Sequence, residues 1–365
     1  RLIIASSFGP EIYGLFSISL IILSFFVSFF SLGLDQGLLR FVSLYRAKNQ
    51  DKKIKYLFGF SVKILFSLSM FAGIILFSFS NFISINIFHN EELAIFLKIF
   101  SLIIPIYIFS YLFLSILRAY EKVTWYSFIL NVFQNVIKVL FIIILIFLGF
   151  KSNAIIVSYF LGVLGMFLLS FYLSKFYFKE LFRSAKLEMR ERIKIRKEFL
   201  SYSWPLMFLG ILSSIFYWTD SFMIGYFKGA IEVGFYNAAF PVAALMGFAP
   251  EIFMQLFFPL ITKEFSRKNF SVIKELSQQV GKWIFMLNLP LLILMVLFPG
   301  AIINLLFGKE YILSETALRI LSVGVFFATL SVSIPSNLLS AIGKSKLLLI
   351  NLIIVFLLNI FLNIL

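Results

Sequence analysis

Polar side chains inside otherwise apolar segments are the residues of this chain best suited to bind a ligand. Segment 123–149 carries four of them on one helical face, because the last three stand at i+3, i+4 and i+7 from the first: Asn131, Gln134, Asn135 and Lys138. A charge near the bilayer centre costs about 2.5–3.5 kcal/mol even on the lenient insertion scale, so it usually faces a bundle interior or a wet cavity. We therefore predict a polar, cationic cavity that Lys138 and its neighbours line.

Other apolar segments carry further candidates for this cavity. They are Asp35 in 12–38, Asp220 in 200–226, Glu251 in 235–261 and Arg319 in 317–342. The carboxylates are candidates for taking up a coupling ion or for pairing with the cations. Ser24, Ser28 and Ser31 share one predicted face with Asp35. Small hydroxyl side chains also let membrane helices approach closely, so packing is the favoured interpretation for the serines.

The composition explains why these residues lie in a membrane. Of 365 residues, 61% are hydrophobic and 13% are charged, whereas an ordinary soluble domain is about 25% charged. The apolar runs are long enough for bilayer-spanning helices of about 20 residues, and too long for the alternating strands of a barrel. We predict an all-α polytopic membrane protein with ten full spans after a stub of another at 1–7. The predicted spans are 12–38, 57–80, 94–117, 123–149, 153–174, 200–226, 235–261, 283–300, 317–342 and 346–365.

The basic residues behind the net charge of +15 lie in alternate connections between the spans, a pattern that indicates the membrane topology. Alternate connections between the spans hold 24 Lys and Arg residues in total, whereas the intervening connections hold only Lys151, Lys228 and Lys309. Short cytoplasmic loops carry the Lys and Arg excess, so the basic connections are predicted to face the cytoplasm. This distribution argues against nucleic acid as a partner and indicates a multi-pass protein of the cell membrane.

An internal repeat relates the two halves of the chain. Gly9 and Gly229, like Gly14 and Gly234, are 220 residues apart. The stretches "NIFHNEELAIFLKIFSLI" at 86–103 and "LLFGKEYILSETALRILSVG" at 305–324 correspond at nearly the same offset. Because this offset relates loops on the same side of the membrane, the repeat is parallel, with an axis along the membrane normal.

The repeat sets the predicted domain organisation. The N-terminal helical bundle occupies 1–174 and the incomplete C-terminal bundle occupies 200–365. Between them, residues 175–199 contain nine basic and four acidic residues interleaved with apolar ones. This pattern predicts a basic amphipathic linker on the cytoplasmic interface, either as a plain charged connection or as a lipid-sensing element.

Signals of catalysis and of metal or cofactor binding are missing from the sequence. It has no cysteine and one histidine, His89, and we find no Gly-rich phosphate loop, catalytic triad or cluster of metal ligands. A membrane-embedded glycosyltransferase would need a positioned base and a metal or phosphate site, and the short outer connections contain no Asp. We therefore predict no enzyme activity, no metal and no cofactor.

Three stretches of the chain are distinctive, namely "GPEIYGLFSISLIILSFFVSFFSLGLDQGLLRFVSLY" at 9–45, "YWTDSFMIGYFKGAIEVGFYNAAF" at 217–240 and "LLFGKEYILSETALRIL" at 305–321. Together they resemble polysaccharide flippases of the multidrug/oligosaccharidyl-lipid/polysaccharide exporter superfamily. The resemblance covers essentially the whole chain and implies two six-helix bundles around a central cavity. On that template the chain lacks most of the first helix and at least one helix at its end.

The resemblance also implies a function. A flippase of this family moves a lipid-linked oligosaccharide from the cytoplasmic to the outer leaflet, with membrane lipids around it and polysaccharide polymerases or glycosyltransferases as partners. The family's first helix often carries a cavity arginine, and Arg1 stands at the matching place, opposite Asp220 in the repeat. A cation-coupled multidrug antiporter of the same superfamily is the alternative, although its cavity should be dominated by acidic residues.

Overall fold

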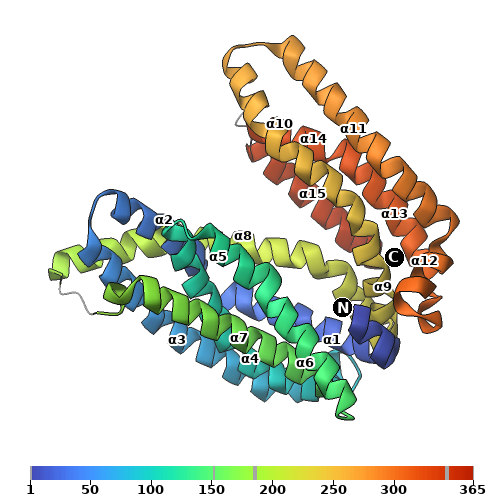
Figure 1. Cartoon of the computed structure of the whole chain (residues 1–365), viewed down its shortest axis with the longest axis horizontal. Coiled ribbons are helices and arrows are strands. Elements are labelled where there is room, and N and C mark those ends of the chain that lie inside the picture. Colours follow the sequence, from blue (N-terminus) through green and yellow to red (C-terminus); the bar gives the residue numbers. More distant parts are fainter. Residues whose placement is uncertain (1, 151–152, 184–186, 342–344, 365) are drawn as a thin grey trace. The chain divides into compact units, whose positions relative to one another are not determined.

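The computed structural model describes residues 2–150, 153–183, 187–341 and 345–364, and no strand occurs in these ranges (Figure 1). Within them, nine helical segments are long and apolar enough to cross a membrane. Two compact units divide the chain, Leu15–Phe222 and the pair Arg1–Gly14 with Met223–Leu365. The prediction of an all-α polytopic membrane protein is therefore confirmed, whereas the predicted domain boundaries at 174 and 200 remain predictions.

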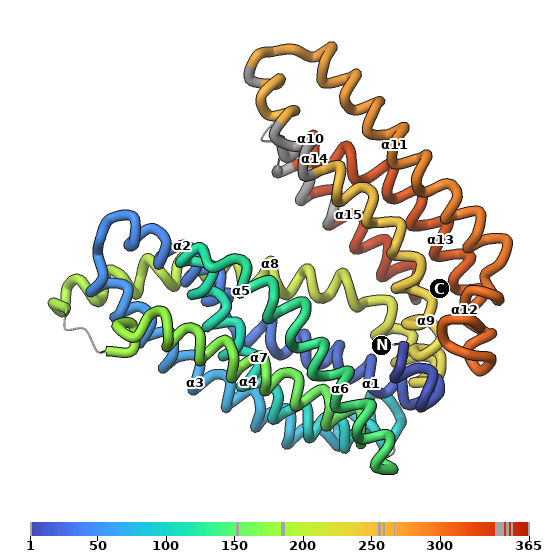
Figure 2. Tube along the Cα trace, in the orientation of Figure 1, coloured from blue at the N-terminus to red at the C-terminus, as the bar shows by residue number. Residues whose placement is uncertain are grey.

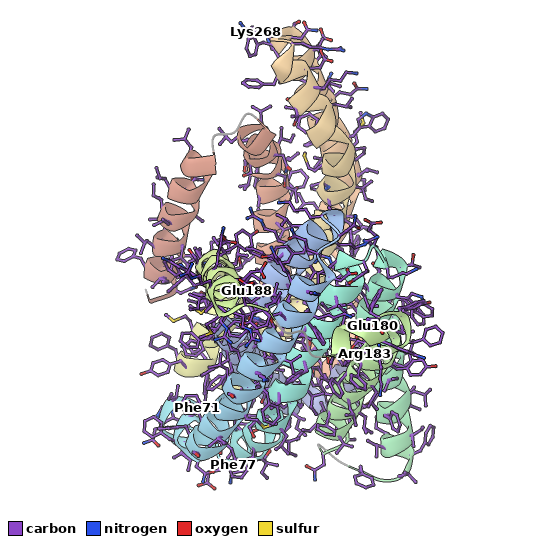
Figure 3. All side chains as sticks on the ribbon, turned by 90° about the vertical axis from the view of Figure 1, so that its left-hand side faces the viewer. Phe71, Phe77, Glu180, Arg183, Glu188 and Lys268 are labelled. Carbon is purple, nitrogen blue, oxygen red and sulfur yellow. The ribbon has the colours of Figure 1, made fainter. Side chains whose placement is uncertain are left out.

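Most of the first half of the chain forms the unit Leu15–Phe222. Its helices are α1 (Leu2–Phe30), α2 (Leu34–Ala47), α3 (Asp51–Phe82) with a π-helical end η1 (Ile83–Ile87), α4 (Leu93–Ala119), α5 (Val123–Ser127), the π-helix η2 (Phe128–Phe133), α6 (Gln134–Phe147), α7 (Asn153–Tyr177), the short 3₁₀ helix η3 (Lys179–Phe182) and α8 (Met189–Phe227). Side chains such as Phe71 and Phe77 project outward from α3 and are more than half exposed (Figure 3). Large exposed apolar side chains on these helices fit a surface that meets lipid rather than water.

The second half of the chain supplies the helices of the other unit. They are α9 (Ala230–Ala243), η4 (Ala244–Gly247), α10 (Phe248–Ser266), α11 (Phe270–Leu297), α12 (Pro299–Phe307), η5 (Lys309–Tyr311), α13 (Ser314–Ser331), α14 (Ser333–Ala341) and α15 (Ser345–Ile364). The 3₁₀ segment η4 interrupts the predicted span 235–261, a change of helical winding that often marks a bend or hinge. Buried Met254, Phe257 and Ile284 join α10 to α11 in this unit's core.

One predicted boundary near the N-terminus is confirmed and another is corrected. Helix α1 is divided at Gly9, whose backbone dihedrals are non-helical (φ 77°, ψ 174°), so the stub 1–7 and the following span are separate helical pieces, as predicted. Helix α1 ends at Phe30, because Leu32 and Gly33 adopt left-handed φ values of 50° and 64°. Asp35 therefore lies on α2, and the prediction that it shares a helical face with Ser24, Ser28 and Ser31 was wrong.

The last residues of the predicted basic linker continue directly into a long helix. Residues 189–199 form the first turns of α8, which continues without interruption to Phe227. The preceding 3₁₀ helix η3 carries Glu180, whose two oxygens accept ion pairs from Lys55 on α3 at 2.8 Å and from Arg183 at 2.7 Å. Figure 3 labels Glu180 and Arg183 where they lie side by side. The linker is thus tied to the unit Leu15–Phe222 by salt bridges.

The repeated glycines form a symmetric helix crossing in the other unit. A Cβ atom on Gly14 would lie 1.7 Å from the carbonyl oxygen of Ala230, and one on Gly234 would lie 2.0 Å from that of Pro10. Pro10 and Ala230 are also 220 residues apart, so each contact is the repeat-related image of the other, as in an isologous interface. Gly229, like Gly9, has positive φ before its helix. The crossing supports the offset inferred from sequence.

Buried aromatic residues fix the start of α1 beside α9 and η5 (Figure 2). Tyr311 is fully buried, its ring lies 6.3 Å from that of Tyr13, and its hydroxyl donates to the carbonyl oxygen of Ala5 at 3.1 Å. The hydroxyl of Tyr13 donates to the carbonyl oxygen of Asn237 at 3.2 Å. Buried phenols that keep hydrogen-bond partners supply large apolar area without an orphaned polar atom. These bonds hold the N-terminal turns in place.

Candidate functional site

Lys138 and Gln134 are brought together on the face of α6 that packs against α7. The ammonium Nζ of Lys138 lies 4.1 Å from the centroid of the Tyr159 ring on α7 and donates to Oε1 of Gln134 at 3.4 Å. An ammonium over an aromatic face is attracted by the ring's quadrupole, more strongly where water is excluded. The structure therefore places a cation, an amide and a phenol at one point inside an apolar span.

The close approach of α6 and α7 positions this cluster. Gly162 lies one turn from Tyr159 on α7, and a Cβ atom there would come within 2.3 Å of Cγ of Lys138. The aliphatic part of the lysine therefore lies flat on α7. Behind the cluster, the Tyr159 ring stacks on Phe100 with a centroid distance of 5.3 Å and meets the edge of Phe16 at 5.6 Å. The ring that receives the cation is thus fixed by packing.

Two tyrosines on α4 extend the polar surface of this unit. The hydroxyls of Tyr107 and Tyr111 lie 3.4 Å apart. Near the end of α4, the guanidinium of Arg118 lies 5.0 Å from the centroid of the Tyr126 ring. Phenols donate and accept hydrogen bonds, so Tyr107 and Tyr111 add polar groups to α4, and Arg118 adds a cation at the end predicted to be cytoplasmic.

Asn131 and Asn135 stand on the same segment but are exposed. Nδ2 of Asn135 donates to the carbonyl oxygen of Asn131 at 2.9 Å. The π-helix η2 ends at Phe133, between the two asparagines, and π segments inside α-helices frequently occur at functional sites. The predicted stripe is therefore divided into a packed pair, Gln134 with Lys138, and an exposed pair.

The serine stripe of α1 has a packing role. Oγ of Ser28 lies 2.7 Å from Oγ of Ser214 on α8, and Ser24 donates to the same oxygen at 3.5 Å. These bonds join α1 to α8 through small side chains, as close-packed membrane helices require. Asp220 is half-buried six residues further along α8, and Oδ2 of Asp35 on α2 accepts a hydrogen bond from Gln36 at 3.2 Å.

The remaining candidates belong to the other unit or lie outside the described residues. Glu251 is exposed in the first turn of α10, where a carboxylate complements the helix dipole. Nε of Arg319 donates to the carbonyl oxygen of Val296 at 3.2 Å, at the C-terminal end of α11, which is a usual place for a basic side chain. Arg1 lies outside the described residues. A substrate-binding or coupling role for these three stays a prediction.

Sequence reasoning missed the partners of Lys138. Tyr159 and Gly162 lie on an uncharged, almost wholly apolar segment, so nothing in their own surroundings distinguishes them from packing residues. Their i, i+3 spacing places them on one helical face, but only the pairing of α6 with α7 shows what that face meets. No group of three or more His, Cys, Asp or Glu residues that could hold a metal ion occurs in the part of the chain that the structure describes.

Comparison with known families and proteins gives consistent matches. The family described as "Polysaccharide biosynthesis protein" matches residues 1–265, and the MatE family matches residues 205–365. A Shigella flexneri protein named "Putative O-antigen transporter" is 25% identical over 361 residues, covering 94% of this chain and 80% of that protein. An uncharacterized membrane protein of Methanocaldococcus jannaschii is 29% identical over 368 residues, covering 95% of this chain and 70% of that protein.

Solved structures share the fold at low sequence identity. A multidrug resistance MATE family transporter of the MOP superfamily, in its inward-facing conformation, has a TM-score of 0.77 at 16% identity, covering 98% of this chain and 82% of that one. A MOP superfamily transporter from Pyrococcus furiosus has a TM-score of 0.58 at 17% identity, covering 96% of this chain and 79% of that one. For that transporter, the reverse polarity of its binding pocket suggests a different function. At these identities the likeness concerns the fold.

Proposed function

This chain belongs to the polysaccharide biosynthesis protein family and is a multi-pass membrane transporter, and from this premise we propose that it flips a polyprenyl-diphosphate-linked oligosaccharide. Transport would run from the cytoplasmic to the outer leaflet by alternating access. The diphosphate and sugars cannot cross hydrocarbon unaided, because each desolvated charge or hydroxyl costs several kcal/mol. The polyprenyl tail can stay in the bilayer throughout.

The observation that carries the proposal is the Lys138 cluster. Lys138 stands 15 residues beyond Val123, or about 22 Å along a helix at 1.5 Å per residue, which is past the middle of a hydrocarbon core of about 30 Å. Snorkelling to either surface is difficult from there. Its ammonium lies over Tyr159 instead. A diphosphate could accept hydrogen bonds from this ammonium, while tyrosine rings and hydroxyls offer apolar faces and polar edges to sugars.

The same cluster distinguishes the proposal from a multidrug antiporter of the same fold. A cavity for cationic drugs needs carboxylates where the cargo sits, whereas the aromatic cluster of α6 and α7 contains a lysine. Asp35, Asp220 and Glu251 are the carboxylates we propose for coupling-ion uptake or for pairing with the cavity cations. The two repeats would rock about their common axis to open the cavity to each side in turn.

The test is substitution of Lys138 in the full-length protein, assayed for flipping of a polyprenyl-diphosphate oligosaccharide in reconstituted vesicles. Lys138→Met keeps the approximate length and removes the charge. A charge-assisted hydrogen bond contributes about 1.5–3 kcal/mol, so the flipping rate should fall about 10- to 100-fold. Lys138→Arg keeps the charge in a different geometry and should retain part of the activity.

Lys122→Met is the matched control. Lys122 starts the same span, is exposed, and has its Nζ 5.0 Å from the centroid of the Tyr177 ring, so the same change removes a lysine from an aromatic ring at the solvated end. It should flip normally. Normal flipping by Lys138→Met, at equal expression and membrane insertion, would show that the lysine only packs. Export of cationic drugs by the wild-type protein, without flipping, would favour the antiporter.

A further inference from the structure

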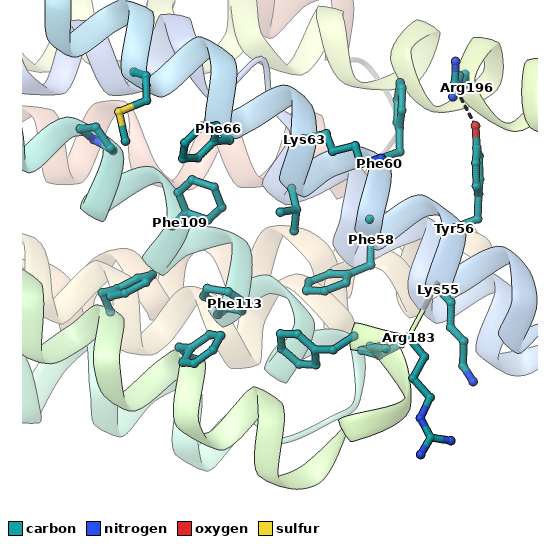
Figure 4. A pocket seen from close by; sticks show the side chains of 18 of the residues that line it. Lys55, Tyr56, Phe58, Phe60, Lys63, Phe66, Phe109, Phe113, Arg183 and Arg196 are labelled. Atoms are coloured by element: carbon teal, nitrogen blue, oxygen red, sulfur yellow. Dashed lines mark hydrogen bonds between the residues drawn. The ribbon is translucent and has the colours of Figure 1, made fainter. Parts of the chain in front are cut away.

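A cavity lies wholly within the unit Leu15–Phe222, apart from the Lys138 cluster. Its volume is about 830 Å³, and it is lined by residues of α3, α4, α7, η3 and the first turns of α8 (Figure 4). This size is within the range of pockets that bind small ligands, about 300–1,000 Å³. None of the residues proposed above for substrate or ion binding lines it.

One part of this cavity is a phenylalanine-lined hollow. Phe113 on α4 lies at its centre, with ring centroids at 5.3 Å from Phe171, 6.0 Å from Phe167 and 6.3 Å from Phe58. Phe58 and Phe113 are buried by this packing. Figure 4 shows Phe58, Phe66, Phe109 and Phe113 along the cavity. The hollow offers carbon surface and no charge.

The other part is strongly basic. Five cations line it, namely Lys55, Lys63, Arg183, Arg192 and Arg196. Glu180 neutralises part of this charge through its pairs with Lys55 and Arg183. Lys63, Arg192 and Arg196 have no salt bridge to a carboxylate among the residues that the structure describes. A site with this charge excess favours an anion.

Contacts with aromatic residues of α3 position the two arginines of α8 at this basic end. Nε of Arg196 donates to the hydroxyl of Tyr56, and its guanidinium lies 4.7 Å from the centroid of the Phe60 ring (Figure 4). The guanidinium of Arg192 lies 5.7 Å from the centroid of the Tyr56 ring, and its Nε is buried with no acceptor in the described structure. A buried guanidinium donor without a partner costs free energy that a phosphate oxygen would offset.

The basic part of the cavity lies toward the membrane interface and its apolar part lies toward the hydrocarbon. The uncharged run of α3 starts directly after Lys63, so this lysine lies near the end of the predicted span 57–80 that the basic connections assign to the cytoplasm. From Lys63 the cavity follows α3 to Met70, seven residues or about 10 Å into the hydrocarbon at 1.5 Å per residue. A ligand that fills it needs an anionic head at the interface and an apolar chain pointing inward.

We propose that this cavity binds one anionic glycerophospholipid of the cytoplasmic leaflet, with its phosphate between Lys63, Arg192 and Arg196 and the start of an acyl chain among the phenylalanines. Basic pockets between membrane helices on the cytoplasmic side bind anionic head groups. A free phosphate would leave the hollow unfilled, and a neutral apolar molecule would leave the cations without a counter-charge. The bound lipid joins the basic start of α8 to α3.

Lipid retention by the purified full-length protein tests the site without a transport assay, so its outcome is independent of the Lys138 experiment. Native mass spectrometry measures binding of phosphatidylglycerol and of zwitterionic phosphatidylcholine. The wild type should retain phosphatidylglycerol preferentially. Arg192→Gln with Arg196→Gln should weaken this binding about 25-fold, because each cation near a membrane surface contributes about fivefold. The same pair of changes at exposed Lys194 and Lys197, on the same helix but outside the cavity, should leave it unchanged.

A second variant fills the cavity without removing charge. Gly59 lines it, and nothing lies within 4 Å of where its Cβ would be, so Gly59→Leu should fold and exclude the lipid. Gly210, equally open but on α8 outside the cavity, gives the control Gly210→Leu. Equal retention by Gly59→Leu and wild type would overturn the proposal, as would equal loss in the Lys194 and Lys197 control. Displacement of phosphatidylglycerol by a polyprenyl diphosphate would show that the transport substrate, not a bulk lipid, occupies the site.

Discussion

The helix crossing built from the repeated glycines gives the sharpest stability prediction, through the substitution Gly14→Ala. The added methyl carbon would lie 1.7 Å from the carbonyl oxygen of Ala230. Ordinary van der Waals contact begins at about 3.4 Å. Because the obstacle is backbone, no side-chain rotation can relieve the clash. Helices α1 and α9 must therefore separate by about 1.7 Å, the difference between these two distances, which also loosens the pair formed by Pro10 and Gly234.

The energetic cost follows from this displacement. Overpacking typically costs 1–3 kcal/mol, occasionally more, and a rigid obstacle on both sides of the crossing places this case at about 3 kcal/mol. At that cost the apparent Tm should fall by about 5 °C. Gly234→Ala should act alike, because its methyl would lie 2.0 Å from the carbonyl oxygen of Pro10. One separation of the helices relieves both clashes, so the double variant should lose less stability than the sum of the single variants.

Thermal unfolding of the detergent-solubilised protein measures these differences. Gly324→Ala on α13 is the control, because nothing lies within 4 Å of the position of its Cβ. Its Tm should be unchanged or higher, since alanine is favoured over glycine in a helix interior by about 1 kcal/mol. An unchanged or raised Tm for Gly14→Ala would refute the close crossing. Strictly additive losses in the double variant would refute the shared displacement.

Two further predictions concern topology and pH. With an impermeant thiol reagent on intact cells, Glu91→Cys in a charge-poor connection should be labelled and Glu188→Cys in the basic linker should not; the reverse pattern would invert the orientation. The hydrogen bond from Lys55, with the nearby charge of Arg183, lowers the pKa of Glu180 below its ordinary value of 4.5. The pKa of Glu180 is therefore lower in the folded state than in the unfolded state. The ionised carboxylate stabilises the folded protein above pH 4.5, and this stabilisation is lost as the pH falls through the folded-state pKa. The Tm of Glu180→Gln should therefore approach that of wild type only in strongly acidic buffer, and an equal Tm difference at pH 7 and pH 3 would contradict this assignment.

The sequence alone determined the class of the protein and the offset of its repeat. Long uncharged runs are incompatible with a soluble fold, because a chain of this composition has too little polar surface to cover a core. Helical spacing placed Gln134 and Lys138 on one face, and the structure confirms that they lie together. Gly14 and Gly234 could be paired from the sequence, because they are separated by the repeat offset of 220 residues. The close backbone contact at each position requires glycine, so both copies of the repeat keep it.

Tertiary structure decided what each face meets. Local periodicity gives the direction of a side chain but not the neighbouring helix, so neither Tyr159 beneath Lys138 nor Ser214 opposite Ser28 could be predicted. The turn at Leu32 and Gly33 removed Asp35 from the predicted stripe, because one left-handed residue pair ends a helix that hydrophobicity would continue. The basic cavity needed α3, η3 and α8 to converge from distant parts of the sequence. Such convergence depends on packing between elements, which a linear pattern of residues does not encode.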